Sequence, residues 1–68
     1  MKLIVNGKEV ETATDLSLEE LLKQHLESGK LDGIAVAVNG EVVPKGLWSD
    51  RVLQSDDRLE IIRAVQGG

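Results

Sequence analysis

The 68-residue sequence has no cysteine, tyrosine or phenylalanine, and it has one tryptophan and one proline. Without cysteine the chain can form no disulfide and no thiolate metal site, and it has no thiol nucleophile. The lack of disulfides in so small a domain fits a reducing compartment, so we expect a cytoplasmic protein. The apolar run at residues 3–5 is far too short for a signal-peptide core or a membrane span.

The charge balance disfavours nucleic acid as a partner. Eight Lys and Arg residues against twelve Asp and Glu residues give a net charge of −4. Nucleic-acid-binding domains usually carry a basic surface and often carry aromatic stacking platforms, and this sequence has neither feature. A single domain of this size buries about 60% of the surface that its unfolded chain exposes, so we do not expect a large internal active site.

Two Asn-Gly pairs predict two β-hairpins. Asn6-Gly7 and Asn39-Gly40 each follow an apolar run, and Asn-Gly favours the positive φ angles of a type I′ turn between antiparallel strands. Pro44 ends the second hairpin, because proline has no amide hydrogen for strand pairing. A turn at residues 55–57 precedes one more strand. The predicted strands are residues 3–5, 8–11, 34–38, 41–43 and 59–62.

One helix is predicted at residues 18–28. Ser17 and Glu20 have the spacing of a capping box, and Leu16 and Leu21 have that of a hydrophobic staple. Gly29 is expected to supply the left-handed residue after the helix. The predicted apolar face consists of Leu18, Leu21, Leu22, His25 and Leu26.

Three other features favour packing over chemistry. Trp48 lies in a connection at residues 45–50, and we expect it to cover one end of the core. His25 has no cysteine or second histidine with which to share a metal, so a packing or surface role is expected. The acidic pairs Glu19-Glu20 and Asp56-Asp57 are interpreted as first-turn helix charges and turn formers.

The element order predicts an α+β fold. The helix must bury its leucines against one face of the sheet, and the last strand can lie in the middle, beside the first. This ββαββ order is the β-grasp arrangement of ubiquitin-like proteins: a mixed sheet of order 2-1-5-3-4 with one main helix on one face. We expect a β-grasp domain at residues 1–64 and a flexible Gly-Gly tail at residues 65–68.

The tail has a physical use. Two glycines form the narrowest main chain available, and four extended residues reach at most about 13–14 Å. Val65 and Gln66 would set how the tail leaves the sheet, Gly67 would give access to a narrow slot, and Gly68 would present the carboxylate. The alternative is an ordinary frayed chain end.

A specific set of residues lies after the turn of the second hairpin and at the end of the chain. Asn39-Gly40 is followed by Val42-Val43-Pro44-Lys45 and Trp48, and the chain closes on residues 64–68, Ala-Val-Gln-Gly-Gly. In these residues, and over essentially its whole length, the sequence resembles the ThiS-type sulfur carriers of thiamine biosynthesis. It departs from their pattern at Lys45, where the family often has Arg, and at Asp56, where it commonly has Gly.

This resemblance implies a carrier and not an enzyme. A ThiF-like adenylating enzyme would use ATP to activate the carboxylate of Gly68, and a sulfur donor system would convert it to a thiocarboxylate. Thiazole synthase would then accept the sulfur. The carrier itself would bind no cofactor and no metal.

A docking patch is a separate hypothesis. Strand alternation places one set of side chains toward the helix: Met1, Leu3, Val5, Val36, Val38, Leu59 and Ile61. It leaves four aliphatic side chains on the other face: Ile4, Ala35, Ala37 and Ile62. Such a patch often marks a binding site, although scattered surface aliphatics are also normal.

Three other functions stay open from the sequence. Molybdopterin-synthase small subunits share the fold and the Gly-Gly end, but they are typically longer and usually approach the tail through a proline. A ubiquitin-like modifier would join Gly68 to a lysine of a target protein. A binding module would carry the Gly-Gly end without using it.

Overall fold

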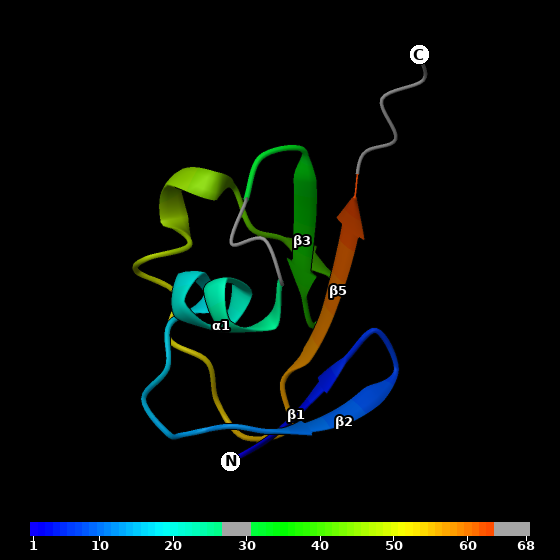
Figure 1. Cartoon of the computed structure of the whole chain (residues 1–68), viewed down its shortest axis with the longest axis vertical. Coiled ribbons are helices and arrows are strands. Elements are labelled where there is room, and N and C mark those ends of the chain that lie inside the picture. Colours follow the sequence, from blue (N-terminus) through cyan, green and yellow to red (C-terminus); the bar gives the residue numbers. More distant parts are fainter. Residues whose placement is uncertain (27–30, 64–68) are drawn as a thin grey trace.

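The computed structural model describes residues 1–26 and 31–63 (Figure 1). Its elements are β1 Lys2–Val5, β2 Lys8–Glu11, α1 Leu18–His25, β3 Ile34–Val38, β4 Glu41–Val42, the short 3₁₀ helix η1 Lys45–Leu47 and β5 Arg58–Arg63. The five strands form one sheet of order β2-β1-β5-β3-β4, which confirms the predicted topology. None of the helices in the described part of the chain has the length and apolar character needed to cross a membrane.

Strand β5 lies at the centre of the sheet, between β1 and β3. It pairs parallel to β1 and antiparallel to β3, whereas the β1–β2 and β3–β4 pairs are antiparallel. The sheet is therefore mixed. Figure 1 shows that β5 runs beside β3 and that its end lies far from the N-terminus.

Both predicted hairpin turns are present. Asn6 and Gly7 have φ angles of 50° and 83°, and Asn39 and Gly40 have angles of 52° and 86°. These positive values at both central residues are those that a type I′ turn requires, and asparagine and glycine adopt them at the lowest cost.

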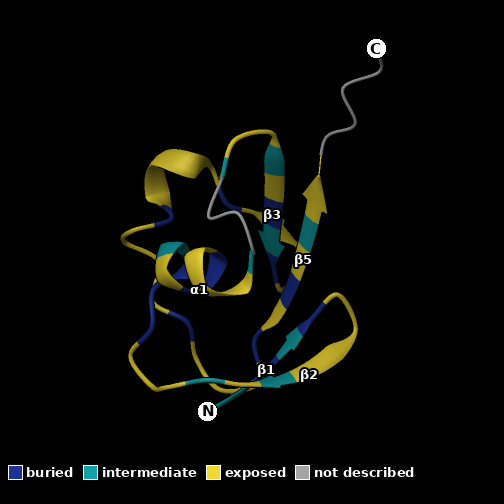
Figure 2. Ribbon diagram, in the orientation of Figure 1, coloured by how far each residue is buried: buried dark blue, intermediate teal, exposed yellow. Residues whose placement is uncertain are grey.

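The core lies between α1 and one face of the sheet, as Figure 2 shows. Helix α1 contributes Leu18, Leu21 and Leu22 to it. The other buried apolar residues are Leu3, Val5, Leu16, Val36, Val38, Val43, Trp48, Leu53 and Leu59, with Met1, Val10, Leu31, Ile34 and Ile61 packed at the margin. The strand residues predicted to face the helix are all in these two groups, so the predicted alternation is confirmed.

The start of α1 has the predicted capping box. The Ser17 side-chain oxygen accepts from the Glu20 amide at 3.1 Å, and the Glu20 carboxylate accepts from the Ser17 amide at 3.0 Å. The next two amides donate to the connection after η1, since Leu18 donates to the Arg51 carbonyl and Glu19 to the Trp48 carbonyl. Amides that the first helical turn leaves without helical partners are thus satisfied.

The predicted end of the helix was wrong. Helix α1 ends at His25, and the backbone of Leu26 is extended, with φ −92° and ψ 121°. The apolar spacing ended at Leu26, and Gly29 extended the prediction to residue 28. Neither feature reports where the backbone angles change. His25 is exposed and Leu26 half-buried, so the buried stripe stops at Leu22. The predicted cap at Gly29 lies outside the described residues.

Trp48 covers one end of the core, as predicted. Its side chain is 2% exposed, and its indole N–H donates to the Val43 carbonyl at 2.8 Å. This bond satisfies the polar atom of an otherwise apolar side chain and joins the connection after η1 to the end of the second hairpin.

Replacing Ser17 by alanine removes the cap and leaves the Glu20 amide without its acceptor. We expect Ser17→Ala to lower the free energy of unfolding by about 1 kcal/mol, measured by urea denaturation. Ser49→Ala, an exposed serine in the connection after η1, is the control and should change it by less than about 0.5 kcal/mol. Equal effects of the two changes would contradict the capping role.

The capping box also makes stability depend on pH. The hydrogen bond from the Ser17 amide lowers the pKa of Glu20. A carboxylate whose pKa is lower in the folded state stabilises that state above its unfolded pKa, and this contribution is lost as the pH falls through the folded pKa. We therefore expect Glu20→Gln to be less stable than the wild type at pH 7, and we expect this difference to shrink as the pH falls below the ordinary glutamate pKa of about 4.3, by urea denaturation at each pH. A constant difference over this range, or the same behaviour in Glu41→Gln, would contradict this account.

Candidate functional site

The predicted carrier residues Val65, Gln66, Gly67 and Gly68 lie outside the described residues. What the structure places is the strand from which they follow. Strand β5 ends at Arg63, and the five residues after it can reach at most about 17 Å. The position of the end of β5 therefore limits which region of space Gly68 can reach.

The two neighbours of β5 hold it over different lengths. Pairing with β3 runs the whole strand, from Leu59 opposite Val38 to Arg63 opposite Ile34. Strand β1 pairs with β5 only at Arg58 and Leu59. One edge of β5 is thus supported by a strand to its end, and the other edge is not.

The face of the sheet away from α1, here called the open face, carries the predicted docking residues. Ile62 is 62% exposed and lies opposite Ala35, which is also exposed. Ala37 is half-buried and lies opposite Glu60, two residues along the same face. Three of the four predicted residues therefore lie on the neighbouring strands β3 and β5.

The fourth predicted residue, Ile4, is set apart from these three. It is half-buried in β1, and Arg58 lies opposite it in the register. Strand β5 lies between β1 and β3, and its residues Arg58 and Glu60 are two positions apart on the same face. They therefore separate Ile4 on β1 from Ala37 on β3. The open face is therefore an apolar area on β3 and β5 with charged residues beside it.

The sequence reasoning missed Val42. This residue lies opposite Ala37 in the edge strand β4 and is 74% exposed, the largest value among the exposed large hydrophobic residues that the structure describes. It extends the apolar area by one strand. Continuing the inward and outward alternation from the buried Val43 back to Val42 would have identified it.

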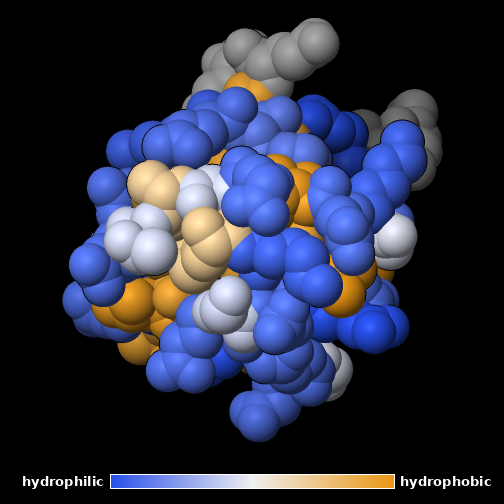
Figure 3. Space-filling view, turned by 90° about the horizontal axis from the view of Figure 1, so that it is seen from below, coloured by the Kyte–Doolittle hydropathy of each residue, from blue (hydrophilic) through white to orange (hydrophobic). Residues whose placement is uncertain are grey.

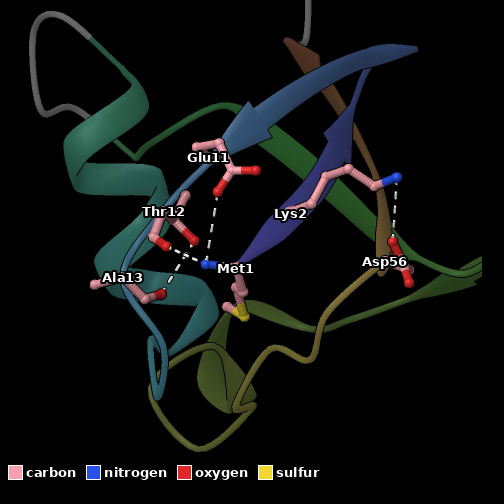
Figure 4. Close-up of polar contacts among 6 residues, drawn as sticks. All are labelled: Met1, Lys2, Glu11, Thr12, Ala13 and Asp56. Atoms are coloured by element: carbon pink, nitrogen blue, oxygen red, sulfur yellow. Dashed lines mark hydrogen bonds and ion pairs between the residues drawn. The ribbon is translucent and has the colours of Figure 1, made fainter.

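Charged side chains lie on the β1–β2 side of the sheet. The ammonium of Lys2 lies 3.6 Å from a Glu9 carboxylate oxygen and 3.5 Å from one of Asp56, and Figure 4 shows the second pair. Glu9, and then Asp56, raise the pKa of Lys2. Both pairs are exposed, so they contribute little to stability. Figure 3, seen from the lower end of Figure 1, shows mostly hydrophilic surface there, with separate apolar areas.

A shallow groove of about 280 Å³ lies beside β4. It is lined by Glu41, Val42, Val43, Pro44, Leu47, Asp50 and Arg51. The ionisable side chains of the groove are Glu41, Asp50 and Arg51, and its lining includes no serine, threonine, lysine or histidine. Within residues 1–26 and 31–63, no three His, Asp or Glu side chains are grouped so that they could hold a metal ion.

The remaining polar residues near β5 have structural contacts. Asp57, directly before β5, is buried, and its carboxylate accepts from the Asn39 side chain at 2.9 Å and from the Gln54 amide at 2.8 Å. Asp56 has a φ of 70°, a conformation that glycine adopts most readily. The predicted turn roles of this acidic pair are confirmed.

Comparison with known proteins gives the family. The model of the ThiS family matches residues 3–68. The chain belongs to the ThiS family. The sulfur carrier protein ThiS of Escherichia coli (strain K12) is 28% identical over 68 residues, with both chains fully covered. The chain is accordingly a ThiS-type sulfur carrier domain of thiamine biosynthesis.

Solved structures of the ThiS family share its fold. A crystal structure of the thiamine biosynthesis protein ThiS from Geobacter metallireducens matches with a TM-score of 0.83 and 30% identity, and both chains are fully covered. A solution structure of a thiamine biosynthesis protein from the same organism matches with a TM-score of 0.78 and 31% identity, over all of this chain and 88% of that one. The expected ubiquitin-like β-grasp fold is confirmed.

A longer protein also matches. It is a thiazole synthase from Paramagnetospirillum magneticum (strain ATCC 700264 / AMB-1), 35% identical over 69 residues. The match covers all of the ThiS-family chain described here and 20% of that protein, so the chain spans about a fifth of that relative's length.

Proposed function

We propose that the chain carries sulfur as a thiocarboxylate on Gly68. The observation that carries this proposal is the full-length match to the sulfur carrier ThiS of E. coli, in a chain whose printed sequence closes on Gly67-Gly68. The absence of cysteine supports it, because the sulfur then has to be held by the main-chain terminus and not by a side-chain thiol.

The chemistry needs an activating partner. A carboxylate is a poor electrophile, so a ThiF-like enzyme joins an oxygen of the Gly68 carboxylate to the α-phosphate of ATP and releases pyrophosphate. A sulfide equivalent from a sulfur donor system then attacks the acyl carbon and expels AMP. The product is a thiocarboxylate, and the carrier acts as a cosubstrate in the cytoplasm with no cofactor of its own.

Thiazole synthase is the proposed acceptor. The likeness of the chain to one fifth of a protein named thiazole synthase supports this pairing, since it links a carrier-like segment to that enzyme's name in one polypeptide. No observation favours the molybdopterin-synthase, modifier or binding-module alternatives over the thiazole route.

The open face is the proposed docking surface for the activating enzyme. Ala35, Ala37, Ile62 and Val42 form its apolar area, and Ile4 lies beyond the charged positions of β5. This area adjoins the end of β5, so a partner bound there would also be close to the chain that leads to Gly68. Apolar areas of this kind commonly mark protein–protein contacts.

Reconstitution with purified partners tests the acceptor. With ATP, sulfide, the ThiF-like enzyme and thiazole synthase, we expect the full chain to support thiazole formation and the Gly68 deletion to support none, as measured by product mass spectrometry. A parallel reaction offers the large subunit of molybdopterin synthase in place of thiazole synthase. Sulfur transfer to that subunit without thiazole formation would contradict the proposed acceptor.

Substitution in the apolar area tests the docking surface. Ile62→Asp places a desolvated charge in the proposed interface, so we expect KM for activation by the ThiF-like enzyme to rise about tenfold or more, while the free energy of unfolding falls by about 1 kcal/mol or less. Val52→Asp is the matched control, because Val52 is 55% exposed and lies in a bridge with Ser17, away from the open face. An unchanged KM for Ile62→Asp, or the same rise for Val52→Asp, would show that this surface is not the docking site.

A further inference from the structure

The asparagines of the two hairpin turns both bind β5, Asn39 at the first residue of the strand and Asn6 at Leu59 and Ile61. Asn39 donates its backbone amide to the Arg58 carbonyl at 2.7 Å, and its side-chain oxygen accepts from the Arg58 amide at 2.9 Å. Asn6 donates its backbone amide to the Leu59 carbonyl at 2.9 Å, and its side-chain oxygen accepts from the Ile61 amide at 2.8 Å. The sequence separation between Asn6 and Ile61 is 55 residues.

The Asn6 side chain occupies a position in the ladder that a strand would otherwise fill. Ile4 and Asn6 donate to the Asp57 and Leu59 carbonyls, which is the spacing of a regular parallel ladder. The next bond of such a ladder would run from the Ile61 amide to the main-chain carbonyl of residue 6. The chain instead turns away at Asn6, with a φ of 50°, and the side-chain oxygen accepts that amide.

The carboxamide of Asn6 also binds Ile61 in the other direction. Its nitrogen donates to the Ile61 carbonyl at 3.4 Å, a long bond beside the shorter one. Both backbone polar groups of Ile61 thus bind Asn6 on one edge of β5, and Val36 of β3 lies opposite Ile61 on the other edge. Beyond Ile61, the described part of β5 pairs with β3 alone, through Ile62 and Arg63.

We propose that Asn6 is a positioning residue for the carrier terminus: its carboxamide extends the support of β5 past the end of β1 and fixes the direction in which the chain leaves the sheet toward Gly68. This inference rests on the proposed function of Gly68. Correct placement of a reacting group lowers the entropy lost on the way to the transition state, so a loosely directed terminus should react more slowly after docking.

The two asparagines provide matched variants. Asn6→Gly and Asn39→Gly each remove one side chain from a type I′ turn that glycine tolerates, so the backbone conformation is kept in both. Asn6→Asp restores an acceptor for the Ile61 amide, and aspartate tolerates the positive φ. None of these residues belongs to the apolar area of the open face.

The experiment combines amide hydrogen exchange with steady-state kinetics of thiocarboxylate formation by the ThiF-like enzyme. For Asn6→Gly we expect faster exchange at Ile61 and about a fivefold lower kcat, the loss that one net hydrogen bond would cause, with KM within about twofold of the wild type because the docking area is unchanged. For Asn39→Gly we expect faster exchange at Arg58 and an unchanged kcat. Asn6→Asp should recover most of the lost kcat.

Two outcomes would overturn the inference alone: a wild-type kcat for Asn6→Gly despite faster exchange at Ile61, or an equal loss of kcat for Asn39→Gly, which would indicate general loosening. If Asn39→Gly does not fold, the comparison of Asn6→Gly with Asn6→Asp tests the inference instead. Equal kcat values for these two variants would show that loss of the side-chain acceptor for the Ile61 amide does not cause the lower kcat, and would overturn the inference. A wild-type chain that forms no thiocarboxylate would overturn the proposed function and this inference with it.

Discussion

The central strand β5 is the constraint on which the rest of the structure depends. It is paired to β1 on one edge and to β3 on the other, so the two hairpins share one sheet only through this strand. Leu59 on its inner side is fully buried beneath α1, and Ile62 on its outer side is exposed. One strand therefore joins the core to the open face and leads to the chain terminus.

A domain of this size has little stability to spare, because small domains bury a smaller share of their surface than large ones. Leaving a buried polar atom without a hydrogen bond would therefore be costly. Among the described residues, no buried side-chain nitrogen or oxygen lacks a hydrogen-bond partner. Three of these side chains each bind a backbone group in a turn, a connection or a helix start: Ser17, Trp48 and Asp57. These hydrogen bonds therefore also fix the segments between the strands and the helix.

The local features of the fold were predictable from the sequence, and the long-range polar contacts were not. The hairpin turns and the capping box depend on residues within a few positions of one another, so their residue types identify them. The bond between Asn6 and Ile61 depends on strand register across the whole chain, which no local pattern reports. The helix end at His25 was missed because residue types and their spacing do not report where the backbone angles change. The exposed Val42 was missed although strand alternation places it on the open face.

The central claim is that the chain carries sulfur on its terminal glycine, and intact-protein mass spectrometry tests it most directly. The chain is incubated with ATP, sulfide and a ThiF-like adenylating enzyme that is active on another carrier. The account predicts the replacement of one oxygen by one sulfur, located at Gly68 by fragmentation. An unchanged mass, or a Gly68 joined to a lysine of another protein, would contradict it.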